Sequence, residues 1–402
     1  MNAYIFDSVR TPRGKGKKDG SLHSVQAPHL AATVLKALKD RNPIGSDGPD
    51  DIIMGCVTQV WEQSGDIAKA AVMLAGFEDS VSGVTLNRFC GSGLEAVNQA
   101  AAQVISGQND LLIAGGVESM SRVNMGTDGP FLLTDPQMIA LYNIVPQGIS
   151  ADLIATKFGY TRERLDAFAV ESHQKAARAW DEKRFERSII PVKDINGQIL
   201  LDKDETIRTD TSIEKMASLQ PSFEMYGEMG GFDAVALQRY PEIEKLEYYH
   251  HPGNSSGIVD GAAAILIGND NAIKKFGLKP RAQIISWAVV GTEPTIMLTG
   301  PAPASLKALS KSELSVHDIH LFEVNEAFAV VPLLFMDELG VPAEKVNVNG
   351  GAIAMGHPLG ATGAIILGTL LDELERINGR YGLATLCIGG GMGIATIIER
   401  IN

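Results

Sequence analysis

The 402-residue sequence has few cysteines, fewer basic than acidic residues, and no long apolar run. Its three cysteines cannot all pair, and their spacing matches no zinc-binding pattern, so neither a disulfide framework nor a metal site is expected. This use of cysteine favours a reducing compartment. The 35 Lys and Arg residues are outnumbered by 48 Asp and Glu residues, and the net charge of −13 argues against a broad nucleic-acid-binding surface. We therefore expect no nucleic-acid partner.

Signals for membrane insertion or export are also scarce. No uninterrupted apolar run reaches the length of about 18 residues that a membrane-spanning helix needs. The first residues lack the basic start and the long apolar core of a signal peptide. We expect no membrane partner and a cytoplasmic location.

Short β-type runs alternate with Ala-rich helical stretches at both ends of the chain, which is typical of an α/β fold. The strands expected in the first half are residues 51–55, 84–87 and 111–116, and those in the second half are 319–323, 346–349 and 384–390. In each half a Gly-rich turn and an apolar helix, about 92–105 and 361–374, follow the middle strand at a similar spacing. The sequence therefore predicts two similar domains that face each other.

Between the two halves the composition changes. Residues 119–250 are richer in Met, Pro, Gly and charge, and they contain one amphipathic helix predicted from Thr161 to about Trp180. A stretch this long is rarely structureless, so we expect a lid over a site formed by the two halves. The predicted domains are an N-terminal core of residues 1–118 plus 251–270, a lid of residues 119–250, and a C-terminal core of residues 271–402.

The first segment that predicts chemistry surrounds Cys90, at the turn between a predicted strand and a helix. A helix N-terminus carries partial positive charge, which favours the thiolate, and a thiolate attacks a thioester or ketone readily. A lone cysteine is more often structural, but the Gly-Ser-Gly sequence at residues 91–93 favours a nucleophile here.

Two further segments place reactive side chains among glycines. His357 lies in residues 350–363 with five glycines and Pro358 around it, which favours a general base over a histidine held only by hydrogen bonds. Cys387 precedes a run of glycines whose N–H groups could bind an oxyanion, and its thiol could act as an acid/base. A glycine-rich loop alone could equally cradle phosphate or simply turn the chain.

The fourth segment, residues 323–329, again lies at a strand end. Its Asn325 could hold a water molecule through its amide, and Glu326 is expected to cap a helix beginning at Ala327.

Together the four segments resemble the thiolase family, and the likeness extends over nearly the whole chain from residues 9–15 onward. The resemblance implies a duplicated five-layer α-β-α-β-α core with an inserted lid. It also implies an acyltransferase that cleaves 3-oxoacyl-CoA with CoA to acyl-CoA and acetyl-CoA, or runs the reverse Claisen condensation. CoA is then a substrate, no cofactor is bound permanently, and the partners are CoA thioesters and further copies of the chain in a homodimer or homotetramer.

The resemblance also implies a role for each site residue. Cys90 is the cysteine that becomes acylated, and His357 is the base that activates it and a donor to the thioester oxygen. Asn325 holds the water of that first oxyanion hole. Cys387 protonates the departing enolate or removes the Cα proton in reverse. The N–H groups of Cys90 and Gly389 form the second oxyanion hole.

Other positions are implied to contact CoA. Ser256 corresponds to a serine beside the pantetheine arm, and Ala327 and Phe328 line the same tunnel. Gln147 and Gln220 stand where many short-chain members carry a His-Met-Gly sequence and a basic residue, respectively. With a longer stretch at about 224–250, these departures favour a longer, branched or polar acyl chain and a degradative role in fatty-acid β-oxidation, over a biosynthetic acetoacetyl-CoA thiolase.

Three other functions are compatible with parts of the sequence. Residues 253–257 fit the Gly-x-Ser-x-Gly pattern of α/β-hydrolases, but the preceding residues are polar and a strand follows where a helix is needed. A condensing ketoacyl synthase would pair one cysteine with two histidines, which Cys387 argues against. A non-enzymatic acyl-binding relative would not need all these groups. Reaction direction, and a regulatory disulfide between Cys90 and Cys387, stay open.

Overall fold

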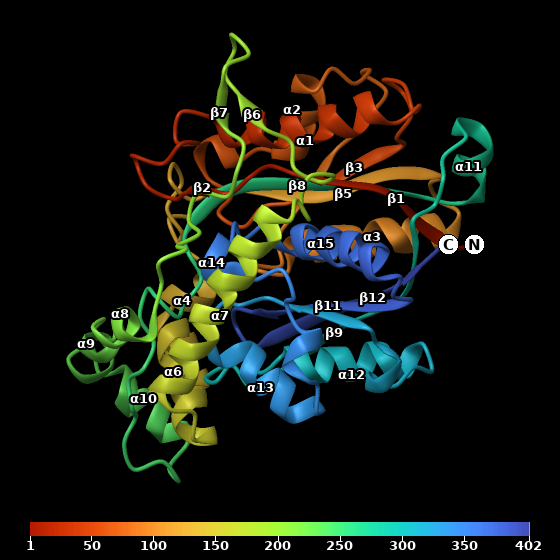
Figure 1. The fold of residues 1–402 in the computed structure, drawn as a ribbon. Coiled ribbons are helices and arrows are strands. Elements are labelled where there is room, and N and C mark those ends of the chain that lie inside the picture. The colour runs from red at the N-terminus through yellow and green to blue at the C-terminus, as the bar shows by residue number, and fades with distance from the viewer. Residues whose placement is uncertain (402) are drawn as a thin grey trace.

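Two half-sheets enclose a central pair of helices and are covered by further helices on their outer faces (Figure 1). The structure is a computed structural model that describes residues 1–401. The helix layers are α1 (Ala27–Arg41) and α2 (Ile67–Leu74) on one outer face, α3 (Ser92–Ser106) and α15 (Thr362–Ile377) in the centre, and α12 (Pro301–Lys311) and α13 (Val330–Leu339) on the other. This five-layer arrangement confirms the predicted fold class.

The strands repeat one order in the two half-sheets. The first half-sheet runs β4-β3-β5-β8-β1 and the second runs β10-β11-β12-β9. The first half consists of β1 (Ala3–Arg10), β3 (Asp51–Gly55), β4 (Val84–Leu86), β5 (Leu111–Ser119) and β8 (Val259–Gly268), with the short β2 (Gly14–Lys15) on β8. The second half consists of β9 (Ala282–Gly291), β10 (Leu321–Val324), β11 (Tyr381–Ile388) and β12 (Met392–Arg400).

The pairing directions show the duplication directly. The strand β3 lies parallel to β4 and β5, and β10 lies parallel to β11. Phe322 of β10 also forms a single parallel bridge with Val346, which stands where β4 stands in the first half. The predicted strand at 346–349 is thus reduced to one bridge. Asn347 has φ 47° and bonds the N–H and C=O of Val324 with its side-chain amide, which replaces the backbone ladder.

The two half-sheets join edge to edge. Ala3, Tyr4 and Ile5 of β1 pair antiparallel with Ile284, Gln283 and Ala282 of β9. Because β1 also pairs with β8, the first strand of the chain links both halves into one continuous sheet.

The central helices approach each other closely because glycines face the contact. A Cβ on Gly93 of α3 would lie 2.7 Å from the carbonyl oxygen of Gly360, and one on Gly363 of α15 would lie 2.2 Å from the amide nitrogen of Leu94. Larger residues would push the helices apart. The N-termini of both helices therefore meet at one point between the half-sheets.

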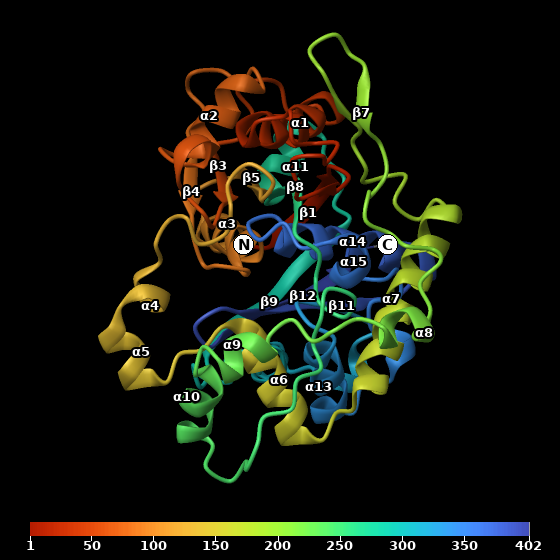
Figure 2. The same cartoon turned by 90° about the vertical axis from the view of Figure 1, so that its left-hand side faces the viewer.

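The segment between β5 and β8 covers one end of the molecule. Its helices are α4 (Phe131–Thr134), α5 (Pro136–Tyr142), α6 (Gln147–Phe158), α7 (Arg162–Asp181), α8 (Ile213–Ala217), α9 (Glu224–Glu228) and α10 (Phe232–Arg239). Figure 2 shows α6 between α10 and α13, α8 beside α7, and α4 and α5 at the left of the view. The hairpin of β6 (Val192–Lys193) and β7 (Ile199–Leu201), of which β7 is labelled, projects beyond α1 at the opposite end. The predicted helix at 161–180 is confirmed as α7, whose N-cap Thr161 accepts from the Arg164 N–H. The domain boundaries stay a prediction.

One stretch of this segment, Pro136–Phe158, is long and apolar enough by composition to cross a membrane. The structure divides it into α5 and α6, with Asn143 in the left-handed region and Pro146 before α6. More than half of its apolar window is buried inside the protein. The remaining short α-helices are α11 (Asp270–Phe276) and α14 (Ala352–Met355).

Candidate active site

Cys90 lies in a tight connection between β4 and α3. Phe89 has φ 44°, a conformation that non-glycine residues rarely adopt, and it places Cys90 at the point of the turn. The Ser92 hydroxyl donates to the Phe89 carbonyl and accepts from the Arg88 N–H, and the Asn87 side chain accepts from the Phe89 N–H. The turn is thus held by its own side chains before any ligand binds.

The Cys90 thiol is buried, with 6% of the residue exposed, and borders a cavity of about 380 Å³. Burial raises the pKa of Cys90 to about 11, although a hydrogen bond from the Gly389 N–H opposes the shift. The expectation that the helix N-terminus favours a resting thiolate is therefore wrong. Desolvation of the charged form outweighs the helix end, and the nearby Glu118 charge adds to the same direction.

His357 lies between α14 and α15, and its ring orientation is set by Thr362. The Thr362 hydroxyl donates to the Pro358 carbonyl at 2.9 Å, so it accepts from Nδ1–H of His357, 2.6 Å away. The lone pair therefore lies on Nε2, a buried atom that bonds no other group of residues 1–401. Burial, followed by the charge of Arg13, lowers the pKa of His357 to about 3. The ring is a neutral imidazole with its basic nitrogen available.

Cys387 is the penultimate residue of β11, just before the glycine loop. The residue is 1% exposed. Burial raises the pKa of its thiol, and the charge of the nearby Cys90 raises it further. Gly390 and Gly391 have φ of 79° and 80°, so the chain turns back into β12 directly after Gly389. This turn presents the Gly389 N–H to the Cys90 sulfur. The structure thus brings both cysteines and Gly389 together.

The loop that carries His357 packs against the cysteine turn. Leu359 shares a small apolar cluster with Cys90. Both Leu359 and Cys90 border the 380 Å³ cavity. The loop that carries His357 therefore reaches the turn that carries Cys90, where α3 and α15 begin.

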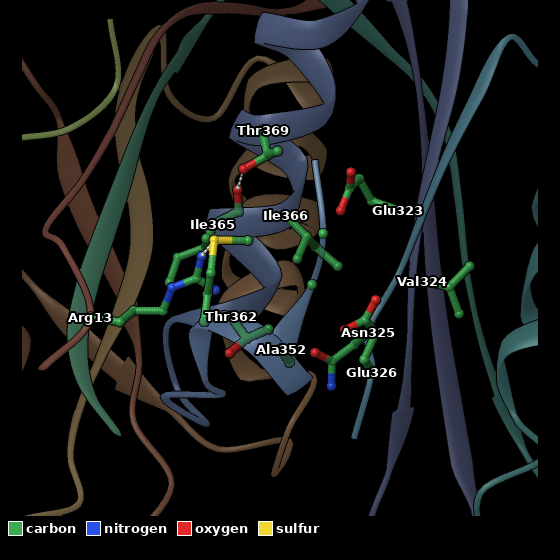
Figure 3. A pocket seen from close by; sticks show the side chains of 13 residues that line it. Arg13, Glu323, Val324, Asn325, Glu326, Ala352, Thr362, Ile365, Ile366 and Thr369 are labelled. Atoms are coloured by element: carbon green, nitrogen blue, oxygen red, sulfur yellow. Dashed lines mark hydrogen bonds between the residues drawn. The ribbon is translucent and has the colours of Figure 1, made fainter. Parts of the chain in front are cut away.

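Asn325 follows β10 and borders a second, much smaller cavity of about 10 Å³. Figure 3 shows its amide and the Glu323 carboxyl on the side of β10 that faces α15, whereas Val324 points away. Among the described residues, neither amide atom of Asn325 has a hydrogen-bond partner, although the residue is 2% exposed. A cavity of this size has room for about one water molecule.

Glu326 does not cap a helix at Ala327, so that expectation is wrong. The helix α13 begins at Val330, and its N-cap is Ala329. The Glu326 carboxylate instead accepts from Ser172 Oγ, from Asn347 Nδ2 and from the N–H of Ile353. It ties α7 of the lid segment to the loop that leads to His357.

Three predicted CoA contacts lie side by side. The Ser256 N–H donates to the Ala327 carbonyl at 2.9 Å, and Phe328 forms a bridge with Ser255. The N–H of His357 donates to the Gly257 carbonyl, which joins the same loop to the candidate base.

The two glutamines differ in position. Gln147, at the start of α6, borders the 380 Å³ cavity, and its Nε2 would lie 3.2 Å from a Cβ placed on Gly389. Gln220 is exposed and does not border that cavity, whereas Phe328 does.

Sequence reasoning missed Glu118, at the end of β5. Its fully buried carboxylate accepts from the N–H groups of Val57, Thr58 and Gly360 and from Gln63 Nε2 at 2.9–3.1 Å. Burial raises the pKa of Glu118, and these donors oppose the rise. A single carboxylate thus joins the first half to the His357 loop. A charged residue ending an otherwise apolar strand was the signal that could have revealed it.

Thr362 was also missed, although it lies within the glycine-rich segment around His357. A hydroxyl five residues after the histidine gives no pattern of its own, so only the structure reveals that it fixes the tautomer.

Potential metal ligands do not gather in the described part of the chain. Within residues 1–401, no group of three His, Cys, Asp or Glu side chains is placed to hold a metal ion. The buried His250 and His251 instead pair with Asp152 and Asp166 at 2.7 and 2.8 Å.

Known proteins match this chain from end to end. A model of the thiolase N-terminal domain matches residues 3–238, and a model of the thiolase C-terminal domain matches residues 278–400. A beta-ketoadipyl-CoA thiolase from Pseudomonas knackmussii is 40% identical, and a 3-ketoacyl-CoA thiolase from Shewanella frigidimarina is 41% identical, each over 99% of both chains. The crystal structure of the Bacillus anthracis acetyl-CoA acetyltransferase superposes with a TM-score of 0.85 at 34% identity, covering 100% of this chain and 99% of that one.

The solved structure shares the fold, and the two domain models and the relatives match the sequence over nearly the whole chain. The chain belongs to the thiolase family.

Proposed function

We propose that this enzyme is a degradative thiolase that cleaves 3-oxoacyl-CoA with CoA to acyl-CoA and acetyl-CoA through an acyl-cysteine intermediate. The single observation that supports it most is the meeting of the Cys90 thiol, the Gly389 N–H and the Cys387 thiol beside a cavity. Relatives named for 3-ketoacyl-CoA and beta-ketoadipyl-CoA favour degradation over the biosynthetic alternative.

In the first half-reaction, Nε2 of His357 takes the Cys90 proton and the sulfur attacks the C3 ketone of the substrate. The C2–C3 bond breaks, its electron pair forms the enolate of acetyl-CoA, and Cys387 protonates C2. The raised pKa of Cys90, about 11, and the lowered pKa of His357, about 3, imply a neutral thiol–imidazole pair at rest. Ion-pair formation therefore has to be coupled to substrate binding, which protects the nucleophile between turnovers.

In the second half-reaction, the thiol of CoA replaces acetyl-CoA in the site. The Cys387 thiolate left by the first half-reaction takes the CoA proton, the new thiolate of CoA attacks the acyl carbon, and the C–S bond to Cys90 breaks, which releases acyl-CoA. The cysteine recovers its proton from His357. Such a two-step cycle requires ping-pong kinetics.

Two oxyanion holes serve these steps. We assign the N–H groups of Cys90 and Gly389 to the tetrahedral centre on the acyl carbon, and His357 with a water on Asn325 to the enolate oxygen. The unpartnered, buried amide of Asn325 supports the second assignment. Loss of one oxyanion donor typically lowers the rate by about 10²–10³-fold.

CoA itself is expected to enter past Ser256, Ala327 and Phe328. The Phe328 ring is held edge-on by His250 and Phe223, with ring centroids 5.4 and 6.0 Å apart. A wall of fixed aromatic rings suits a narrow tunnel for the pantetheine arm. Gln147 lies close enough to Gly389 to contact the thioester, whereas a role for exposed Gln220 requires the distal part of CoA to reach the surface.

We also propose that the chain forms a homodimer or homotetramer in the cytoplasm. The strand β4 ends the sheet order, and Val84 within it is 43% exposed. The helix α2, which contacts β4, exposes the apolar Met73 and Leu74. An apolar sheet edge of this kind favours pairing with a second copy. Light scattering of the purified protein will show a multiple of 42.9 kDa, and a monomer will overturn the assignment.

The test of the function is acylation of Cys90. Mixing the enzyme with a 3-oxoacyl-CoA in the absence of free CoA will place the shortened acyl group on the Cys90 peptide, detected by mass spectrometry. Cys90→Ala will abolish the adduct and lower thiolysis by more than about 1,000-fold. Cys56→Ala is the matched control because Cys56 packs in the core of the first half, and it will keep the adduct. An active Cys90→Ala enzyme would overturn the proposal.

A further inference from the structure

The cavity next to Cys90 is almost entirely apolar. Its volume is about 380 Å³, within the range of small-molecule pockets. The apolar side chains that dominate its wall are Met125, Leu132, Val145, Phe223, Met297 and Leu359. Methionine and leucine side chains adapt to the shape of a hydrocarbon chain, so the cavity suits a flexible apolar ligand.

Charge is present on this wall with one sign only. Among the described residues that border the cavity, Asp128 is the single charged side chain, and there is no Lys, Arg or His. Asp128 lies in the loop before α4, and its charge is close enough to add to the raised pKa of Cys56. A negative group on the ligand would therefore meet a carboxylate and no cation.

The position of the cavity identifies the part of the substrate that it receives. Cys90, Gly389 and Gly390 form one wall, and Leu132 packs against Gly390, where an added Cβ would lie 2.5 Å from Leu132 Cδ2. Of the predicted CoA contacts, Gln147 and Phe328 border it, whereas Ser256 and Ala327 do not. Met125, Asp128 and Leu132 are not among the predicted CoA contacts, so we assign their part of the wall to the acyl group that Cys90 accepts.

The free energy of transfer from water into this lining predicts which acyl chains the cavity favours. Each methylene moved from water into an apolar cavity strengthens binding about fourfold. A carboxylate moved into the same surroundings meets no cation, and only the side chains of Thr58 and Gln147 as donors, so its transfer is opposed far more strongly. A carboxylate-ended acyl chain and an alkyl chain of equal length should therefore behave very differently.

We propose that this enzyme acts on 3-oxoacyl-CoAs whose acyl chain ends in an uncharged alkyl group, and that the apolar wall with Asp128 rejects chains ending in a carboxylate. The inference rests on the proposed thiolase function and narrows it. It separates this chain from its beta-ketoadipyl-CoA relative, whose substrate ends in a carboxylate. It also narrows the longer, branched or polar chain expected from the sequence to an apolar one.

The experiment compares two six-carbon substrates, 3-oxohexanoyl-CoA and 3-oxoadipyl-CoA, which differ by a methyl and a carboxylate at the chain end. The value of kcat/KM for the hexanoyl substrate will exceed that for the adipyl substrate by at least about tenfold. Equal values, or a preference for the adipyl substrate, would overturn the inference and leave the proposed function intact. Cleavage of neither would overturn both.

Two variants test the wall itself. Met125 is 59% exposed on the cavity rim, so Met125→Arg places a cation there with little risk to folding, and Met125→Gln is the uncharged control. Met125→Arg will raise kcat/KM for 3-oxoadipyl-CoA at least fivefold, and Asp128→Asn about threefold, because each makes the wall less negative. Met125→Gln will not raise kcat/KM for 3-oxoadipyl-CoA. Neither charge variant will raise kcat/KM for 3-oxohexanoyl-CoA. If kcat/KM for 3-oxoadipyl-CoA is unchanged in both charge variants, the assignment of this wall to the end of the acyl chain is wrong.

Discussion

At the scale of single residues, the hydroxyl of Thr362 decides which nitrogen of His357 carries the proton. It donates to the Pro358 carbonyl and so accepts from Nδ1–H, which leaves the Nε2 lone pair for the nucleophile. An imidazole without this partner is free to rotate or to adopt the other tautomer.

Thr362→Val keeps the side-chain shape and removes the acceptor. We expect kcat to fall about 10- to 100-fold, as for other residues that orient a functional histidine. The change in KM should be smaller because Thr362 does not border the Cys90 cavity. Thr369→Val is the matched control, since that hydroxyl bonds only the Ile365 carbonyl one turn earlier on the same helix. A fall of equal size in both variants would point to the helix and not to the tautomer.

Glu118 acts on both reacting residues through the loops that it joins. In Glu118→Gln, an NH2 group would face some of the N–H groups that the carboxylate now accepts, so the loops of Val57 and Gly360 would separate. We expect a loss of about 10- to 100-fold in kcat.

A second measurement on the same variant isolates the charge. Because the Glu118 carboxylate raises the pKa of Cys90, its removal should lower that pKa, and iodoacetamide should react faster at a given pH. Glu95→Gln, on α3, is the control because Glu95 pairs with Arg88 and bonds neither loop. If the pH profile of alkylation is the same in Glu118→Gln as in the unaltered enzyme, the Glu118 charge does not raise the pKa of Cys90.

At the scale of elements, Gly350 sets how closely α7 approaches the His357 loop. Its φ is 73°, and a Cβ there would lie 2.5 Å from the Ser172 carbonyl oxygen on α7. Gly159, which ends α6, has nearly the same φ of 72° with open space around it. A comparison of the two glycines therefore separates the cost of a positive φ from the cost of a steric clash with α7.

Gly159→Ala should cost about 1–2 kcal/mol of unfolding free energy from its positive φ alone. Gly350→Ala should cost about 1–3 kcal/mol more, because α7 has to move as well. Urea denaturation will measure both values. Equal losses of unfolding free energy in the two variants would show that α7 moves aside at no energetic cost.

Elements with a regular apolar pattern were predictable, and those that depend on a single polar contact were not. Local periodicity gave α7, β3 and the starts of α3 and α15 within a few residues. The failures at 346–349 and at Glu326 share a cause. In both places a side chain, Asn347 or Glu326, bonds to distant backbone, and no local pattern reveals such a partner.

The candidate site divides in the same way. The sequence predicts Cys90, His357 and Cys387 as the reacting residues because glycine-rich turns mark them. It does not predict the protonation state of the Cys90 thiol, because the helix end is a local feature whereas the burial comes from the Gly389 and Leu359 loops far along the chain.

At the scale of the whole molecule, buried histidines make stability depend on acid. Burial lowers the pKa of His357 to about 3 and that of His173 to about 4, below the ordinary value of about 6.5. Between pH 6.5 and these pKa values, His357 and His173 bind protons in the unfolded chain but not in the folded chain. The free energy of unfolding therefore falls as the pH is lowered through this window.

Each such histidine contributes a slope of up to about 1.4 kcal/mol per pH unit. In His357→Asn the slope between pH 6 and 4 should be smaller than in the unaltered enzyme by about that amount. Urea midpoints measured across this range will test it. Parallel stability curves for the two proteins would show that His357 takes up a proton in the folded state.

The pairing of β1 with both β8 and β9 has a consequence for synthesis on the ribosome. The first strand emerges early, yet its partner β8 begins roughly 140 residues after β5 ends, and β9 follows later still. At about 5–20 residues per second, the nascent N-terminal half waits on the order of 10 s with two strand edges unfilled. Slow translation or scarce chaperones would therefore reduce the yield of this enzyme before any completed molecule could misfold.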